Sequence, residues 1–108
     1  MGTNTFKNEQ AASITTQATV YTAPVGKTAI ALELDIANTA GTTASVDVVI
    51  NDSSASTQVY LVKGTNILPG SSMKCVSGQK IVLDGSDSIQ VASDVTVDCM
   101  ISVLEDVN

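Results

Sequence analysis

One tripeptide in this sequence, Gly26-Lys27-Thr28, could bind the phosphate of a nucleotide. The phosphate-binding loop of nucleotide hydrolases ends in Gly-Lys-Thr or Gly-Lys-Ser, has another glycine five positions earlier, and opens a helix. Tyr21 stands where that earlier glycine belongs, and Pro24 removes a backbone N–H from the loop. Residues 28–37 then alternate in polarity like a strand, so no helix dipole faces the site. We therefore interpret residues 23–26 as a connection between two strands.

Two pairs of carboxylates could act as general acid and base or bind calcium. Glu33 and Asp35 share the outward side of a predicted strand, and Asp84 and Asp87 flank a predicted turn. A calcium loop of the EF-hand type has acidic or amide residues at its first, third and fifth positions and Gly at the sixth. Gly85 instead follows directly after the first acid. We expect the first pair to be a solvated face and the second to be a solubilising turn.

The chain contains no His, so it has neither the commonest general base nor a Ser-His or Cys-His nucleophile pair. Cys75 and Cys99 are its two cysteines. In a cytosolic product we expect buried, reduced thiols, although their spacing leaves a disulfide between them open. Two cysteines without His do not form a usual zinc site. We predict no enzymatic activity, no metal and no cofactor.

The charge balance excludes several classes of partner. Five lysines stand against eleven acids, which gives a formal net charge of −6. Nucleic acids and anionic membranes are bound chiefly through Lys and Arg, so we expect neither as a partner. The apolar runs are too short to span a bilayer. The first ten residues lack an apolar signal region, so we expect synthesis and retention in the cytoplasm of the producing cell.

The 108 residues suit one domain, and short strand-like segments are separated by turn residues along the chain. These segments lie around Val20 and at 29–37, 45–50, 58–62, 72–76, 80–83, 88–92 and 95–104. In segment 29–37, Ile30, Leu32, Leu34 and Ile36 share the predicted buried face. Intervals of roughly eight to twelve residues are typical of a sandwich or small barrel. We predict an all-β fold: a single small antiparallel β-sandwich of about eight strands, jelly-roll-like or immunoglobulin-like.

The first seventeen residues differ from the rest, because they are polar and show no sustained period. Phe6, the only phenylalanine, and Ile14 are their isolated apolar residues. Two interpretations fit: a frayed arm or strand packed on its own domain, or an arm that docks on a partner through Phe6. We divide the chain into a polar N-terminal arm, residues 1–17, and a β-sandwich domain, residues 18–108.

Several apolar residues fall on the outward side of predicted strands. They either form the second side of the sandwich under loops or an oligomer face. Together with the two apolar residues of the arm, the candidate partner-binding residues are Phe6, Ile14, Val49, Val62, Met100 and Leu104.

Three stretches resemble small virion proteins of tailed bacteriophages, with those of marine and cyanobacterial phages the most similar. They are VYTAPVGKTAIALELDIAN at 20–38, VYLVKGTNILPGSS at 59–72 and KIVLDGSDSIQV at 80–91. The resemblance covers about residues 18–104 and depends on turn residues and strand pattern. This chain has Asp-Gly-Ser-Asp at 84–87 where the group usually has Pro-Gly-Asp. It therefore keeps turn-forming residues at this place but lacks the proline.

The resemblance implies a structural protein of the virion, made in the host cytoplasm. The expected role is a capsid decoration (cement) protein that binds the major capsid protein on the outer shell and stabilises it. A neck, tail or fibre adaptor is the alternative, and a glycan-binding module of the host surface is a third, which the shortage of aromatic residues disfavours. The resemblance also implies a homo-oligomer, for which a trimer is one arrangement.

Overall fold

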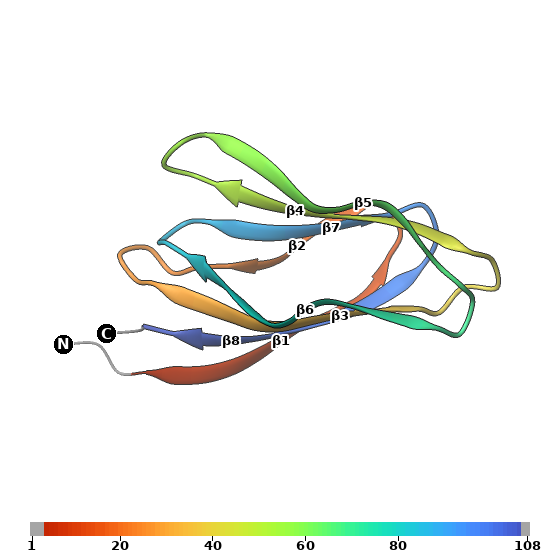
Figure 1. Cartoon of the computed structure of the whole chain (residues 1–108), viewed down its shortest axis with the longest axis horizontal. Helices are drawn as coiled ribbons and strands as arrows, with labels where there is room; N and C mark the ends of the chain where they lie inside the picture. The colour runs from red at the N-terminus through yellow and green to blue at the C-terminus, as the bar shows by residue number, and fades with distance from the viewer. Residues whose placement is uncertain (1–3, 107–108) are drawn as a thin grey trace.

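The computed structural model describes residues 4–106, apart from the side chains of residues 78 and 79, and places them in eight strands (Figure 1). The strands are β1 (Thr5–Ile14), β2 (Gln17–Thr22), β3 (Ala29–Asn38), β4 (Ala44–Asp52), β5 (Thr57–Ile67), β6 (Ser72–Leu83), β7 (Ser88–Ser93) and β8 (Val97–Glu105). The predicted all-β fold of about eight strands is therefore confirmed.

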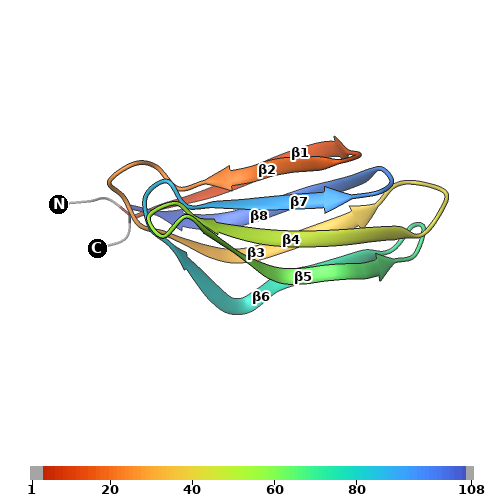
Figure 2. The ribbon, with the colours of Figure 1, turned by 90° about the horizontal axis from the view of Figure 1, so that it is seen from above.

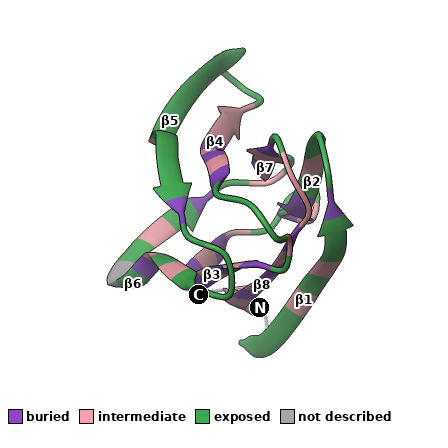
Figure 3. Ribbon diagram, turned by 90° about the vertical axis from the view of Figure 1, so that its right-hand side faces the viewer, coloured by how far each residue is buried: buried purple, intermediate pink, exposed green. Residues whose placement is uncertain are grey.

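The strands form two stacked four-stranded sheets whose neighbours are all antiparallel. One sheet has the order β1-β8-β3-β6 and the other β2-β7-β4-β5. This order is that of an eight-stranded jelly roll, one of the two sandwich types that the sequence left open. It also makes β1 and β2 edge strands on one side of the sandwich and β5 and β6 edge strands on the other, as Figures 2 and 3 show. We call these sides the β1–β2 flank and the β5–β6 flank.

The core between the sheets is aliphatic. Its largest fully buried side chains are Leu34, Ile36, Leu83, Ile89 and Ile101, with valines from both sheets around them. Close packing of branched side chains takes the place of aromatic ones in this core, because each fully buried Leu, Ile or Val contributes about 1.5–3 kcal/mol. The one phenylalanine lies outside this core.

A bulge in β3 changes which residues face the core. The register shifts between Ala31 and Glu33 in the pairings of β3 with both β6 and β8. Ala31 is buried before this shift and Leu34 after it, whereas Ile30 and Leu32 are only half-buried. The strict alternation expected for segment 29–37 was therefore wrong before the bulge and right after it. Side chains alternate between the two faces of a sheet, so one extra residue moves every side chain after it to the opposite face.

Within the segment 1–17, Thr5–Ile14 belong to the sandwich. Thr5–Ile14 form β1, which pairs antiparallel with β8 along the edge of its sheet. This strand packs on its own domain, and docking of the same segment on a partner through Phe6 stays a prediction. A polar strand fits this place because an edge strand covers the core only in part.

The Gly26-Lys27-Thr28 tripeptide lies in the connection between β2 and β3. The Lys27 N–H donates to the Pro24 carbonyl at 3.1 Å, and Gly26 has a φ of 77°, which glycine adopts without strain. The turn packs closely on the β6–β7 connection, where a Cβ on Gly85 would lie 2.7 Å from the Gly26 nitrogen. The interpretation as a strand connection is confirmed, since β3 follows directly.

Candidate interaction surfaces

Four apolar side chains, one from each strand of the β1-β8-β3-β6 sheet, lie in a single cross-strand row. Phe6 is opposite Leu104, Leu104 is opposite Ile30, and Ile30 is opposite Val82. Residues directly opposite one another project from the same face of a sheet. This face is the outer one, because the neighbours of Leu104 and Ile30 on their own strands, such as Val103, are fully buried.

The two ends of this apolar row are the most exposed. Phe6 is 76% exposed and Val82 is 63% exposed, while Leu104 and Ile30 are half-buried between them. The core does not require an apolar row on the solvent side of a sheet. Because contiguous exposed apolar surface is typical of interaction sites, the row is a candidate for one.

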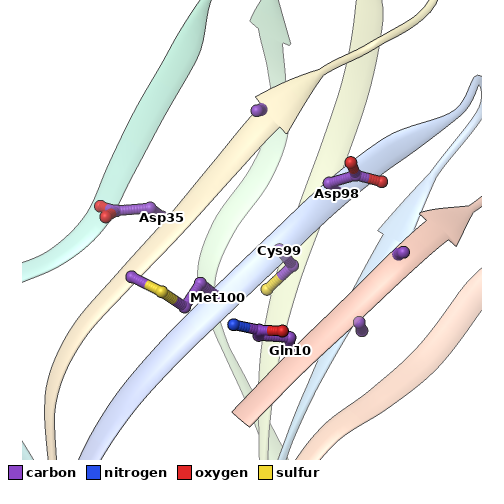
Figure 4. A pocket seen from close by; sticks show the side chains of 8 residues that line it. Gln10, Asp35, Asp98, Cys99 and Met100 are labelled. Carbon is purple, nitrogen blue, oxygen red and sulfur yellow. The ribbon is translucent and has the colours of Figure 1, made fainter. Parts of the chain in front are cut away.

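A shallow depression of about 280 Å³ lies on the same outer face, between β1, β8 and β3 (Figure 4). Gln10, Met100 and Asp35 occupy opposed positions on these three strands and line it. The other lining residues are Ala11, Ala12, Ala37, Asp98 and Cys99. The alanines leave the space open, and Asp35 and Asp98 place carboxylates at its margin.

The six candidate partner-binding residues lie in different environments. Phe6 and Leu104 belong to the apolar row, and Met100 lines the depression. Ile14 is 5% exposed and lies in the core, because a bulge between Ala11 and Ile14, with Ser13 at a φ of 58°, turns it inward.

The other two candidates lie in the β2-β7-β4-β5 sheet. Val49 is 6% exposed, with its register partners Tyr60 and Gln90 on either side. Val62 is opposite Val48 and packs against the core. Ile30 and Val82, which complete the apolar row, were missed as site residues. In the sequence each of them is only an apolar residue in a predicted strand. The β3 bulge and the long-range strand pairing decide which face its side chain projects from.

The two cysteines are thiols in the structure, from β6 and β8 on either side of β3. Burial raises the pKa of the Cys75 thiol to about 11 and that of Cys99 to about 12. These pKa values include smaller contributions from the charge of Asp35 for Cys75, and from Cys75 and then Asp35 for Cys99. A thiol is nucleophilic only as the thiolate, so neither cysteine is activated for catalysis at neutral pH.

The acids around the β6–β7 turn have a structural role. The Asp87 carboxylate is buried and accepts bonds from the backbone N–H of Ser53 at 3.0 Å and of Asp84 at 3.1 Å. It therefore fixes the β4–β5 loop against this turn. Among residues 4–106 no group of three or more His, Cys, Asp or Glu side chains is placed to hold a metal ion.

A polar cluster closes the β1–β2 flank between the sheets. The Tyr21 hydroxyl, from β2, donates to Glu105 of β8 at 2.5 Å. Lys7 of β1 lies 3.8 Å from Glu105 and 3.6 Å from Glu9. Burial raises the pKa of Tyr21 well above its usual value, and the bond to Glu105 raises it further. One lysine faces two carboxylates here, so the cluster is net negative.

The described part of the chain contains no helix long and apolar enough to cross a membrane. No protein-family model matches the chain, and no curated protein sequence matches it.

Solved structures share its fold at low sequence identity. A chain of the acid-stable capsid of Helicobacter pylori bacteriophage KHP30 aligns with a TM-score of 0.58 and 12% identity, over 99% of this chain and 90% of that one. A chain of the T13 particle of infectious bursal disease virus aligns with a TM-score of 0.58 and 9% identity over 94% of this chain. This chain spans only 31% of that viral chain. The Drosophila NLP core, whose structure concerns pentamer formation and histone binding, aligns with a TM-score of 0.57 and 10% identity, over 94% of this chain and 97% of that one.

Proposed function

We propose that this chain is a structural protein of a virion, and that it decorates the outer surface of the capsid. The main support is the likeness to a chain of the KHP30 capsid, which extends over nearly the whole of both chains. Three stretches of the sequence resemble small virion proteins of tailed phages, which supports the same role independently of the fold.

The properties of the surface fit a protein that works by binding. Its cysteines are not activated, and the carboxylate of Asp87 is engaged by backbone amides. The apolar row and the depression beside Met100 share the outer face of one sheet. We propose that this face, through Phe6, Leu104 and Met100, contacts the major capsid protein. Many copies of such a modest contact, repeated over a shell, would strengthen it against the pressure of packaged DNA.

The copy number in purified virions tests the proposal. Quantitative mass spectrometry of the particles should find this chain on the order of hundreds of copies, as expected when every symmetry-related capsid site is occupied. A few dozen copies or fewer would favour the alternative role as a neck, tail or fibre adaptor. Absence from the virion would refute both.

A binding assay tests the proposed capsid face. Leu104→Asp should weaken binding to particles stripped of this protein by about 10- to 100-fold, because burying one leucine is worth roughly 1.5–3 kcal/mol. Val25→Asp is the matched control, since Val25 is an exposed residue of the β2–β3 loop and is not part of the apolar row. Equal binding by the two variants would argue against this face.

A further inference from the structure

The β5–β6 flank is unusual in both charge and exposure. Residues 53–83 contain three lysines and no Asp or Glu, whereas the rest of the chain contains two lysines and all eleven acids. Of the seven large apolar side chains that are exposed among the described residues, five belong to this segment: Val59, Tyr60, Leu61, Leu68 and Val82. In Figure 3 the whole of β5 except its end is coloured as exposed or half-exposed.

This flank is where two copies of an acidic chain can approach each other. Two of its lysines pair with carboxylates of inner strands. Lys63 lies 3.5 Å from Asp47, and Lys74 lies 3.3 Å from Glu33 and 3.4 Å from Asp35. No carboxylate projects from β5 or β6 themselves. A neighbouring copy would therefore meet chiefly apolar side chains there, beside lysines whose charge these carboxylates offset. Its own β1–β2 flank carries the net-negative cluster of Lys7 with Glu9 and Glu105.

The apolar row indicates how the copies would be oriented. Its two exposed ends, Phe6 and Val82, lie on β1 and β6, the opposite edge strands of one sheet. Because neighbours in this sheet alternate in direction, β1 and β6 run antiparallel. The β1 of a second copy could then lie against β6 as a fifth antiparallel strand, and its Phe6 would meet Val82.

We infer that the β5–β6 flank binds the β1–β2 flank of a second copy of this chain, head to tail, and that the contact repeats to close a ring. Strands of this length run about 35–40 Å, and two sheets about 10 Å apart with their side chains give a flank roughly 20 Å deep. The area, roughly 700 Å², is close to the ~800 Å² per partner of a standard stable interface. A head-to-tail contact that closes requires three or more copies.

The mass of the purified protein in solution tests the inference without any particle, so its result is independent of the virion role. Sedimentation and light scattering should give one discrete species of at least three times the 11.1 kDa chain mass. Val59→Asp and Val82→Asp on one flank, and Phe6→Asp on the other, should each reduce this species to the monomer. Val25→Asp is the matched control and should leave it unchanged, since Val25 is 85% exposed but in the β2–β3 loop.

Cross-linking tests the orientation directly. The double variant Phe6→Cys with Val82→Cys should form intermolecular disulfides on oxidation and give a ladder of oligomers in a non-reducing gel. Within one copy the two positions are three strand spacings apart, about 14 Å, which is too far for a disulfide. Each single variant, and the pair Val25→Cys with Val82→Cys, should stay monomeric in the gel.

Three results would overturn the inference. A monomeric wild-type protein would mean that the lysines on these strands only protect the edges from aggregation. A two-fold dimer, seen as cross-linking by a single cysteine variant, would replace the head-to-tail contact. An oligomer that persists in Val59→Asp and Val82→Asp would place the contact elsewhere. Far-ultraviolet circular dichroism of each variant shows that the fold is intact, as expected for substitutions at exposed side chains.

Discussion

The hydroxyl of Tyr21 joins the two sheets, so replacing this residue with Phe should measurably destabilise the sandwich. Tyr21 belongs to β2 and its acceptor, Glu105, to β8 of the other sheet. A hydrogen bond to a charged group contributes about 1.5–3 kcal/mol. In the variant, Glu105 would still have Lys7 3.8 Å away and would be partly exposed to water. The loss of stability should therefore lie near the lower end of this range, about 1–2 kcal/mol. With a urea m-value of about 1–3 kcal/mol/M, the unfolding midpoint should fall by roughly 0.3–2 M.

The pH dependence gives this prediction a second readout. The pKa of Tyr21 is higher in the folded protein than in the unfolded chain, where it is about 10. Its contribution to stability is therefore complete below pH 10 and is lost as pH rises above that value, by about 1.4 kcal/mol between pH 9 and pH 11. Tyr21→Phe lacks this term, so the difference in unfolding free energy between the two proteins should shrink over the same range.

The assay is urea unfolding of both proteins at pH 7, 9 and 11, followed by circular dichroism. Tyr60→Phe is the matched control, because Tyr60 is an exposed tyrosine on β5, and it should change stability by less than about 0.5 kcal/mol. A Tyr21→Phe protein as stable as the wild type at pH 7, with a parallel pH profile, would refute the reasoning that this bond ties the sheets together.

Two further predictions concern the packing of the sandwich. Gly85→Ala should destabilise the protein by about 1–3 kcal/mol in urea unfolding, because its Cβ would press on the Gly26 backbone. Gly41→Ala, which has open space around it, should change stability by less than about 0.5 kcal/mol, and equal effects would contradict the close approach of the two turns. Cys75 and Cys99 should resist alkylation by iodoacetamide at pH 7.5 and react in urea, because burial raises the pKa of each thiol to about 11 and about 12. Rapid labelling of the folded protein would contradict this burial.

The strand content could be predicted from the sequence because alternation and turn residues are local signals. Segments such as 45–50, 88–92 and 95–104 coincide with β4, β7 and β8 to within a few residues. β1 gave no such signal, since an edge strand needs few apolar residues. It forms because β8 offers it a pairing partner nearly ninety positions away in the chain.

The side of the sheet from which an individual side chain projects was less predictable, because β-bulges change it. Phe6 and Ile14 are eight positions apart and would share a face in a regular strand. The bulge before Ile14 instead sends Phe6 to the solvent and Ile14 to the core. The apolar row depends on three long-range pairings and on the β3 bulge, so local pattern alone could not place Ile30 and Val82 beside Leu104.

A cryo-electron map of the assembled virion tests the central proposal most directly. The account predicts density for this jelly roll at repeated positions on the outer capsid surface, with the outer face of the β1-β8-β3-β6 sheet toward the shell. Density for the chain only at the neck, tail or fibres would contradict the decoration role. A particle map that leaves no density for this fold anywhere would contradict the virion role altogether.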